Sequence, residues 1–341
     1  MIVFSPGSVD PAPGSGVPSI FTHYNTKIIN CNRNYIEIPG KIWYPTPGDF
    51  MKREQLTGIF QLLFATLIWG CAFVAQSVGM EHLGPMSFQA VRSLLAVAAM
   101  LPMILVMDRS PGQYFLRWKS RSLWKTGILC GLALFAAQGL QQVGLQYTEP
   151  GKAGFITAMY IVLVPVLGLF LGRKCGIRVW ISVLLAVGGL YLLSCAGVST
   201  INTGDILILI SAGAFAVQIL LIDHLAQSLD GLRLNCVQFM VVTVLSALAA
   251  AWTEAPTWQG ILRSALPLLY TGVLSSGVAF SLQILGQKHL PPEPASLIMS
   301  LESVFAVLCA WLLLGQTLRP VEAVGCVLVF IGVILSQTKQ K

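Results

Sequence analysis

The chain has 341 residues, of which 55% are hydrophobic and 10% charged, and its formal net charge is +7. A soluble globular domain carries about 25% charged residues, so this chain has too few to cover a surface in water. The positive charges lie between long apolar runs, not in a basic stripe interleaved with stacking aromatic residues. This distribution argues against a nucleic-acid-binding protein and indicates a protein embedded in a lipid bilayer.

Residues 1–50 differ in composition from the rest of the chain. They are rich in Pro, Gly and Ser, as in SPGSVDPAPGSGVPS, and contain no apolar core typical of a signal peptide. Such a composition favours disorder. Met51 is followed by KREQ and then by the first long apolar run. We therefore expect residues 1–50 to be a disordered or dispensable N-terminal extension.

A series of apolar runs follows Met51, each close to the length of about 20 residues that a helix needs to cross the hydrocarbon core. Pro and Gly separate many of these runs, as in PPEP at 291–294. The sequence therefore predicts an all-α polytopic membrane protein with about ten transmembrane helices. The predicted spans are 57–79, 86–107, 124–147, 153–172, 177–196, 204–225, 232–252, 265–287, 294–314 and 319–337.

Lys and Arg are distributed unequally between the two sets of predicted loops. One set carries most of them, including Arg53 and Arg121, whereas the other carries only Lys152, Arg263 and Arg319. Positive residues concentrate in cytoplasmic loops. The sequence therefore predicts a multi-pass protein of the cell membrane, plasma or inner, with both termini in the cytoplasm.

The chain contains an internal repeat, with one half at 57–196 and the other at 204–337. Each half has five predicted spans, an odd number, so the second half enters the membrane from the opposite side. Inverted repeats of this kind usually place a substrate site near the midplane, between the halves. Apolar helices can align by chance, but matches of Gly and polar residues favour a true repeat. The aligned positions are Gly58 with Gly204, Trp69 with Phe215, Leu83 with Leu229, Arg92 with Gln238, LQQVG (140–144) with LQILG (282–286), Ala153 with Ala295 and Ile156 with Ile298.

Four stretches of the chain resemble the drug/metabolite transporter superfamily, EamA-type. They are LIWGCAFVAQ (67–76), LGPMSFQAVRSLLA (83–96), LQQVGLQYTEPGKAGFITAMYIVLVPVLGLFLG (140–172) and LIMSLESVFAVLCAWLLLGQTL (297–318), and the resemblance covers about 57–337. The resemblance implies ten helices in two five-helix repeats. It also implies movement of small metabolites or drugs across the cell membrane, often as export. The second half has Phe215-Ala216 in place of Trp69-Gly70, so we do not carry the role of Trp69 over to Phe215.

Two predicted spans carry a charged side chain well inside the membrane, Arg92 and Glu302. A charge at the centre of a span costs about 2.5–3.5 kcal/mol, so each should face the bundle interior. Arg92 is either a structural counterion, a side chain that snorkels to the interface, or a substrate contact. Glu302 is either half of a buried salt bridge, with Arg92 as a candidate partner, or a protonatable or cation-binding group. Desolvation raises the pKa of a carboxyl group toward neutrality, which suits a proton-coupled step.

Uncharged side chains are further candidates for the wall of a substrate cavity. Gln138 and Gln142 lie on one helical face together with Gln141. The alternative is simple interhelical hydrogen bonding, but we expect Gln138 and Gln142 to line a cavity. Trp69 and Tyr160 are either aromatic walls of that cavity or ordinary packing residues. The remaining amide candidates are Gln218, Gln238 and Gln283.

Charged residues at the ends of predicted spans have different expectations. Glu293 suits the positive N-terminus of a helix, whereas Lys152 at such an end does not, so we expect Lys152 to have a specific partner. Asp223 and His224 lie at the end of their span, where solvation at the interface is enough to explain them.

The sequence contains none of the motifs HExxH, GxSxG or Walker A, and its eight cysteines are scattered without a CxxC. We expect no enzyme, no cofactor, no metal site and no disulfide framework. The prediction is a secondary transporter that moves a small metabolite or drug by alternating access. Export is the favoured direction, protons are a candidate coupling ion, and the protein is a monomer or homodimer. An intramembrane enzyme or a channel-like protein is the alternative, although no filter-like sequence supports a channel.

Overall fold

A computed structural model describes residues 35–36, 44–45, 47–108, 116–173, 175–194, 201–314 and 319–337. The chain divides into two units, Met1–Lys52 and Arg53–Lys341. In the first unit, strand β1 (Tyr35–Ile36) pairs antiparallel with β2 (Tyr44–Pro45). Apart from these strands and the start of the first helix, the expected N-terminal extension lies outside the described residues.

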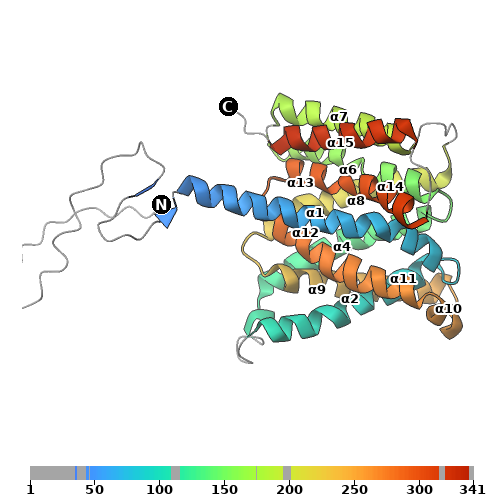
Figure 1. Cartoon of the computed structure of the whole chain (residues 1–341). Helices are drawn as coiled ribbons and strands as arrows, with labels where there is room; N and C mark the ends of the chain where they lie inside the picture. Colours follow the sequence, from blue (N-terminus) through green and yellow to red (C-terminus); the bar gives the residue numbers. More distant parts are fainter. Residues whose placement is uncertain are drawn as a thin grey trace, which may run out of the picture. The chain divides into compact units, whose positions relative to one another are not determined.

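The second unit is a bundle of helices, several of which run side by side across it (Figure 1). Most of the bundle helices begin within a few residues of Pro, Ser, Asn or Asp, which are common at helix N-termini. The helices are α1 (Pro47–Gly79), α2 (Pro85–Met107), α4 (Arg121–Gly144), α5 (Pro150–Thr157), α6 (Tyr160–Phe170), α7 (Ile177–Ser194), α8 (Thr203–Leu225), α9 (Gly231–Thr253), α10 (Trp258–Arg263), α11 (Ala265–Leu269), the π-helical segment η1 (Tyr270–Ala279), α12 (Phe280–Gln287), α13 (Pro292–Met299), α14 (Leu301–Leu314) and α15 (Pro320–Gln337).

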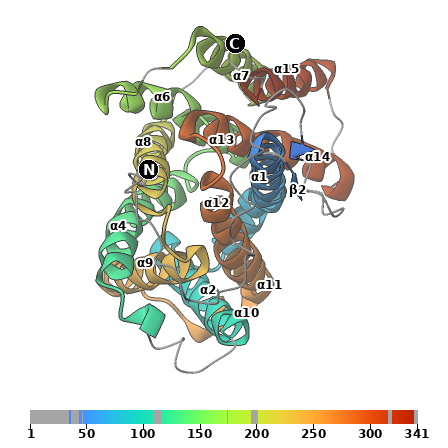
Figure 2. The ribbon, with the colours of Figure 1, turned by 90° about the vertical axis from the view of Figure 1, so that its left-hand side faces the viewer.

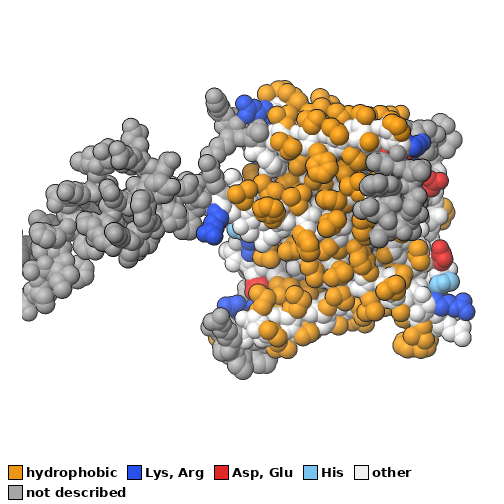
Figure 3. Space-filling view, in the orientation of Figure 1, with side chains coloured by type: hydrophobic (Ala, Val, Ile, Leu, Met, Phe, Trp, Pro, Cys, Tyr) orange, Lys and Arg blue, Asp and Glu red, His pale blue; other side chains and the backbone are white. Residues whose placement is uncertain are grey.

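Within the described residues, nine helical segments are long and apolar enough to cross a membrane. Ile177–Leu193 is a shorter apolar helix at the position of the fifth predicted span, whose last predicted residues lie outside the described part. Hydrophobic side chains cover most of the visible face of the bundle, and charged side chains gather at its two ends (Figure 3). The prediction of an all-α, multi-pass membrane protein is confirmed.

Three of the predicted spans are interrupted instead of being continuous α-helices. The span at 153–172 consists of α5 and α6, which are separated at Ala158 and Met159. Its counterpart at 294–314 consists of α13 and α14, which are separated at Ser300. The span at 265–287 contains η1, and π-helical turns are frequent at functional sites. The first two interruptions occur at the same place in the two halves.

Equivalent helices of the two halves pack against each other. Helix α2 packs on α9, and α7 packs on α15. In the view along the bundle, α4 and α8 lie on one side, whereas α1 and α12 lie on the other (Figure 2). These four helices also cross in equivalent ways, because a Cβ atom at Gly58 would lie 3.0 Å from the carbonyl oxygen of Gly286, and one at Gly144 would lie 2.9 Å from that of Gly204. This arrangement agrees with an inverted repeat, while the division at 57–196 and 204–337 stays a prediction.

The antiparallel helices α2 and α9 are tied together at both ends. At one end, Asp108 after α2 forms an ion pair with Arg233 in the first turn of α9. At the other end, the carboxylate of Glu254 accepts hydrogen bonds from the backbone N–H groups of Met86 and Ser87, each at 2.8 Å. Glu254 thereby satisfies two donors that the start of α2 leaves without a partner inside the helix.

Ion pairs connect other helix ends as well. Lys152 in α5 forms an ion pair with Asp205 in α8 at 2.6 Å, so the expectation of a specific partner for Lys152 is confirmed. Asp223 is paired with Arg173, and its side chain is largely buried. The expectation that interfacial solvation alone explains Asp223 is therefore wrong, because α6 ends close enough to α8 to supply a cation.

Candidate functional site

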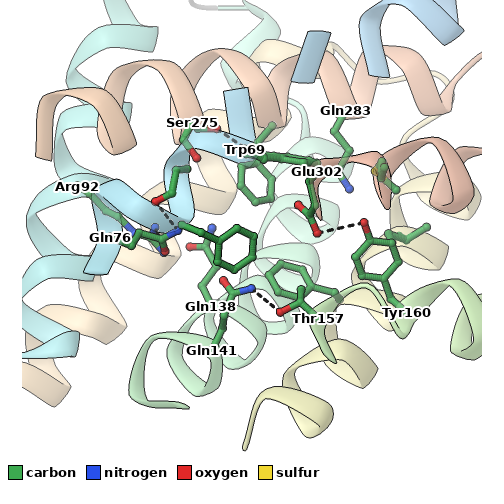
Figure 4. A pocket seen from close by; sticks show the side chains of 16 residues that line it. Trp69, Gln76, Arg92, Gln138, Gln141, Thr157, Tyr160, Ser275, Gln283 and Glu302 are labelled. Atoms are coloured by element: carbon green, nitrogen blue, oxygen red, sulfur yellow. Dashed lines mark hydrogen bonds between the residues drawn. The ribbon is translucent and has the colours of Figure 1, made fainter. Parts of the chain in front are cut away.

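A small polar cavity lies inside the bundle and is surrounded by the side chains of 16 residues (Figure 4). Its volume is about 50 Å³. The lining comes from both halves of the chain, and its polar members are buried. The lining residues are Trp69, Ala72, Phe73, Gln76, Arg92, Gln138, Gln141, Thr157, Tyr160, Phe215, Ile219, Ser275, Phe280, Gln283, Met299 and Glu302.

Most of the lining residues occupy equivalent positions of the repeat. The alignment that pairs Gly58 with Gly204 also pairs Trp69 with Phe215 and Phe73 with Ile219. The alignment that pairs LQQVG (140–144) with LQILG (282–286) also pairs the cavity residues of α4, α5 and α6 with residues of the second half. The cavity therefore lies where the two halves meet. The further pairs are Gln138 with Phe280, Gln141 with Gln283, Thr157 with Met299 and Tyr160 with Glu302.

Glu302 reaches the cavity because its helix begins next to it. Helix α14 begins at Leu301, immediately after the interruption at Ser300, so Glu302 lies in the first turn of a new helix. Tyr160, its repeat equivalent, is the first residue of α6 after the corresponding interruption. The hydroxyl group of Tyr160 donates a hydrogen bond to Oε1 of Glu302 at 3.3 Å. The two helix breaks thus bring a carboxylate and a phenol together between the halves.

Arg92 lies on the opposite side of the cavity from Glu302 (Figure 4). Its guanidinium group donates hydrogen bonds from Nη1 to Oε1 of Gln76 at 2.7 Å and from Nη2 to Oε1 of Gln89 at 3.3 Å. The side chain is 2% exposed, so it does not snorkel to an interface. In the described part of the chain no carboxylate pairs with Arg92, and the interpretation of Arg92 and Glu302 as a salt bridge is therefore wrong.

The three glutamines on α4 do not behave alike. Gln138 and Gln141 line the cavity, and Nε2 of Gln141 donates a hydrogen bond to the hydroxyl of Thr157 at 2.9 Å. Gln142 does not line it, because its Nε2 atom points to the sulfur atom of Met80 at 2.9 Å. The expectation for Gln138 is met, whereas that for Gln142 is wrong. Residues four apart share a face only approximately, and Gln142 lies on the edge that packs against α1 and the turn after it.

The other candidate amides form a chain that ends at the cavity. Gln283 lines the cavity, and its Nε2 atom donates to Oε1 of Gln218 at 3.2 Å. Nε2 of Gln218 donates in turn to Oε1 of Gln238 at 3.2 Å. Gln218 and Gln238 do not line the cavity, but their hydrogen bonds fix the position of the Gln283 side chain. Gln238 is the repeat equivalent of Arg92, yet only Arg92 reaches the cavity.

Aromatic side chains form much of the remaining wall. Trp69 donates a hydrogen bond from Nε1 to the backbone oxygen of Ser275 in η1 at 3.4 Å, and its ring centre lies 4.8 Å from that of Phe280. Phe215 also lines the cavity. Sequence reasoning missed Phe215 as a site residue although the alignment with Trp69 pointed to it. It also missed Thr157 and Ser275. The repeat is the sequence signal for Thr157, whereas Ser275 lies in η1, which only the structure shows.

Three buried polar atoms of lining residues have no hydrogen-bond partner among the described residues. They are Nε of Arg92, Oε1 of Gln138 and Oε1 of Gln283. A buried polar atom without a partner costs about 1–3 kcal/mol, so each is a favourable position for a polar group of a ligand or for water. The cavity as it stands holds roughly three to five water molecules at about 10–15 Å³ each.

Comparison with known proteins assigns the chain to a family. The model of the EamA-like transporter family matches it twice, at residues 56–195 and 202–338. The chain belongs to the EamA-like transporter family. It is therefore a membrane transporter and not an enzyme, as the sequence predicted. Both matches cover cavity residues, so each copy of the family's unit contributes part of the cavity wall.

Relatives of this EamA-like transporter support the same conclusion. An uncharacterized transporter from Archaeoglobus fulgidus is 32% identical over 83% of this chain and 86% of the relative. The transporter YoaV from Bacillus subtilis is 21% identical over 81% of this chain and 94% of the relative. A chloroplastic WAT1-related protein from Arabidopsis thaliana is 25% identical over 84% of this chain and 70% of the relative. A solved crystal structure with 18% identity shares the fold, with a TM-score of 0.68 over 84% of this chain and 96% of that one.

Proposed function

We propose that this EamA-like transporter is a secondary transporter that carries a small polar metabolite or drug through the cavity between Arg92 and Glu302 by alternating access. The proposal rests chiefly on one observation, namely that two opposite charges face one small cavity at the junction of the two halves without pairing with each other. A channel needs an open path, and an enzyme needs reactive groups close together. Arg92 and Glu302 are instead placed to contact two ends of one solute.

The size of the cavity supports a mechanism in which the two halves of the bundle move relative to each other. A volume of about 50 Å³ is too small for a metabolite of more than a few atoms. Ligand sites that enclose small molecules have volumes of about 300–1,000 Å³. The halves must therefore separate to admit a solute. Inverted repeats allow such a rearrangement because either end can open while the other stays closed.

Ties at the two ends of the bundle are suited to act as gates. At the end where α9 begins, Arg233 is paired with both Asp108 and Asp230. At the other end, Lys152 is paired with Asp205. The pairs Arg233–Asp108 and Lys152–Asp205 each join the first half to the second, whereas Arg233–Asp230 lies within the second half. We infer that transport breaks one set of ties at a time, and that breaking both is prevented by their combined strength.

Glu302 is the group that we assign to energy coupling. Its carboxylate is buried, accepts a hydrogen bond from Tyr160, and has no cation as partner in the described residues. A buried carboxylate without a cation is stable only if it takes up a proton or binds a positively charged group. Proton exchange at Glu302 would let a gradient drive the cycle, with export as the favoured direction. Both termini are proposed to be cytoplasmic, since Lys and Arg are concentrated in the set of loops that the predicted topology places on the side of the termini.

The test is transport in vesicles that contain the purified protein, with candidate solutes screened by a proton-gradient pulse. Glu302→Gln keeps the size and hydrogen-bonding ability of the side chain but cannot release a proton. We expect gradient-driven accumulation to be lost, while exchange of labelled for unlabelled solute continues. Glu293→Gln is the matched control, because Glu293 is also a buried carboxylate but does not line the cavity. Gradient-driven accumulation by a folded Glu302→Gln protein would remove the coupling role from Glu302.

A further inference from the structure

Two cysteine thiols meet between the halves of the bundle. Cys71 lies in α1 and Cys309 lies in α14, 238 positions apart in the chain. Their sulfur atoms are 2.7 Å apart. A disulfide bond has a length of about 2.05 Å, so a shift of about 0.65 Å joins the two sulfur atoms. This distance places the pair closer to a covalent bond than to an ordinary contact between thiols.

A close approach of the two helices explains why the thiols meet. Gly70 precedes Cys71, and a Cβ atom at Gly70 would lie 2.7 Å from Cβ of Phe305 and 2.8 Å from the backbone nitrogen of Ala306. Only a glycine allows α14 to come this near. Cys309 is one helical turn beyond Phe305, so it faces the residue that follows Gly70. The meeting of the sulfur atoms is thus a consequence of backbone packing.

The other described cysteines differ from this pair. Cys130 and Cys236 are fully buried in apolar clusters. Cys175 lies 3.9 Å from a carboxylate oxygen of Glu293. In the described residues no other two cysteines approach each other. Cys71 and Cys309 are only half-buried, so protein atoms do not enclose the pair completely.

We propose that Cys71 and Cys309 are an oxidative modification site at which a hydroperoxide, such as hydrogen peroxide, forms a reversible disulfide bond between the two halves of the transporter. The sequence expectation of no disulfide framework is compatible with a single regulatory bond. The pair could not be recognised from spacing, because only the fold brings α1 next to α14.

The reaction balances with hydrogen peroxide as the oxidant. One thiol sulfur attacks a peroxide oxygen, the O–O bond breaks, and a sulfenic acid and one water molecule form. The second thiol sulfur attacks the sulfur of the sulfenic acid, the S–OH bond breaks, and a second water molecule leaves. The two thiols together lose two electrons and two protons, and the peroxide gains both. A dithiol such as dithiothreitol reverses the bond by thiol–disulfide exchange.

The bond has a consequence for transport that rests on the proposed function. Trp69 and Glu302, both in the cavity wall, are carried by the same two helices as the thiols. A covalent link between α1 and α14 prevents these helices from separating. The cavity then keeps its present volume of about 50 Å³. Oxidation at this site therefore arrests the transporter, and reduction releases it.

The first experiment measures the bond itself in purified protein, independently of any solute. The protein is treated with hydrogen peroxide, its free thiols are alkylated, and its peptides are identified by mass spectrometry without reduction. We expect the peptides of Cys71 and Cys309 to appear joined and to separate after dithiothreitol. Cys326→Ser, which removes another half-buried thiol, should not change this result, whereas Cys309→Ser should abolish it. Free thiols at both positions after treatment would overturn the proposal.

The second experiment measures opening of the cavity without a known solute. A Gln141→Cys variant carries a reporter thiol in the cavity wall, and its labelling by N-ethylmaleimide is read at that residue by peptide mass spectrometry. We expect labelling in the reduced protein and protection after peroxide treatment, with no protection when Cys309→Ser is added. Equal labelling of the linked and reduced proteins would show that the bond does not lock the cavity. If the bond forms and protects while no screened solute moves, the proposed transport function fails and the modification site stands.

Discussion

The two halves of the bundle have similar backbone arrangements but differ in the side chains that they present to the cavity. Both halves interrupt the same span, at Ala158 and Met159 in the first half and at Ser300 in the second. The cavity receives its cation from the first half, at Arg92, and its carboxylate from the second, at Glu302. In a transporter that works as proposed, similar backbone arrangements allow the two ends of the bundle to open and close in equivalent ways. The divergent side chains give the cavity a positive group on one side and a carboxylate on the other (Figure 4).

The largest effect is expected when the first half is made to match the second at position 92. Arg92→Gln gives that position the residue found at Gln238. We expect solute flux to fall roughly 10- to 100-fold, because hydrogen bonds to a charged group contribute about 1.5–3 kcal/mol. The measurement is the initial rate of uptake into vesicles, normalised to the folded fraction from size-exclusion chromatography. Arg92→Lys is the control, and it should restore part of the flux.

If Arg92→Gln transports at the wild-type rate, the charge at this position serves only the packing of α2. The difference between Arg92 and its repeat equivalent Gln238 would then have no effect on transport.

The ion pairs at the ends of the bundle are expected to contribute to the stability of the protein. Asp108→Asn removes one partner of a pair whose two side chains are 3% and 1% exposed, which leaves Arg233 with the half-exposed Asp230. Breaking a buried pair costs about 3–5 kcal/mol, so we expect a clear loss of unfolding free energy. Glu322→Gln, in the pair whose cation Arg319 is 58% exposed, should cost no more than about 1 kcal/mol. Thermal unfolding in detergent compares the two variants. Equal losses of stability would show that the buried pair of Asp108 and Arg233 contributes no more than the pair of Arg319 and Glu322.

The paired glycine crossings give a graded comparison of the halves. At Gly204 an added Cβ would lie 2.6 Å from the carbonyl oxygen of Gly144, whereas at Gly58 it would lie 3.0 Å from that of Gly286. Overpacking costs about 1–3 kcal/mol. We expect Gly204→Ala to destabilise the protein by more than Gly58→Ala, as measured by denaturant unfolding of each variant. The reverse order would mean that α1 adjusts less readily than α8.

The smallest effect is expected at the aromatic wall. Trp69→Phe makes the first half match Phe215 of the second and removes the long hydrogen bond from Nε1 to Ser275. Such a bond contributes about 0.5–1.5 kcal/mol, so we expect solute flux to change by no more than roughly tenfold. The apparent affinity from concentration-dependent uptake is the sensitive readout. A complete loss of transport would show that the indole contacts the solute directly.

Much of the fold could be predicted from the sequence, because apolar length and the position of Lys and Arg are local properties that the bilayer constrains strongly. The interruptions within spans could not be predicted, since α5, α6, α13 and α14 lie in continuous apolar runs without a consistent breaking residue. Six of the candidate residues line one cavity, because polar groups in a membrane must face the interior, whereas the candidates Gln142, Gln218 and Gln238 do not line it. The six are Gln138, Trp69, Tyr160, Arg92, Glu302 and Gln283.

The errors concern partners, which depend on side-chain geometry. Arg92 binds Gln76 and Gln89 from its own half instead of Glu302. Gln142 turns toward Met80. Asp223 finds Arg173 across a distance of 50 positions in the chain. None of these contacts has a signature in residue spacing, and each required the positions of neighbouring helices.

The glycine crossings of α1 with α12 and of α4 with α8 also have a mechanical meaning. At each crossing two helices come close enough for the added Cβ of a glycine to meet the backbone of its neighbour. The crossing of α1 with α12 lies near Lys288, at the end where α9 begins, and the crossing of α4 with α8 lies near Asp205, at the other end. In a transporter that works as proposed, each crossing is a fixed contact at one end of the bundle, about which a pair of helices can tilt while the opposite end opens.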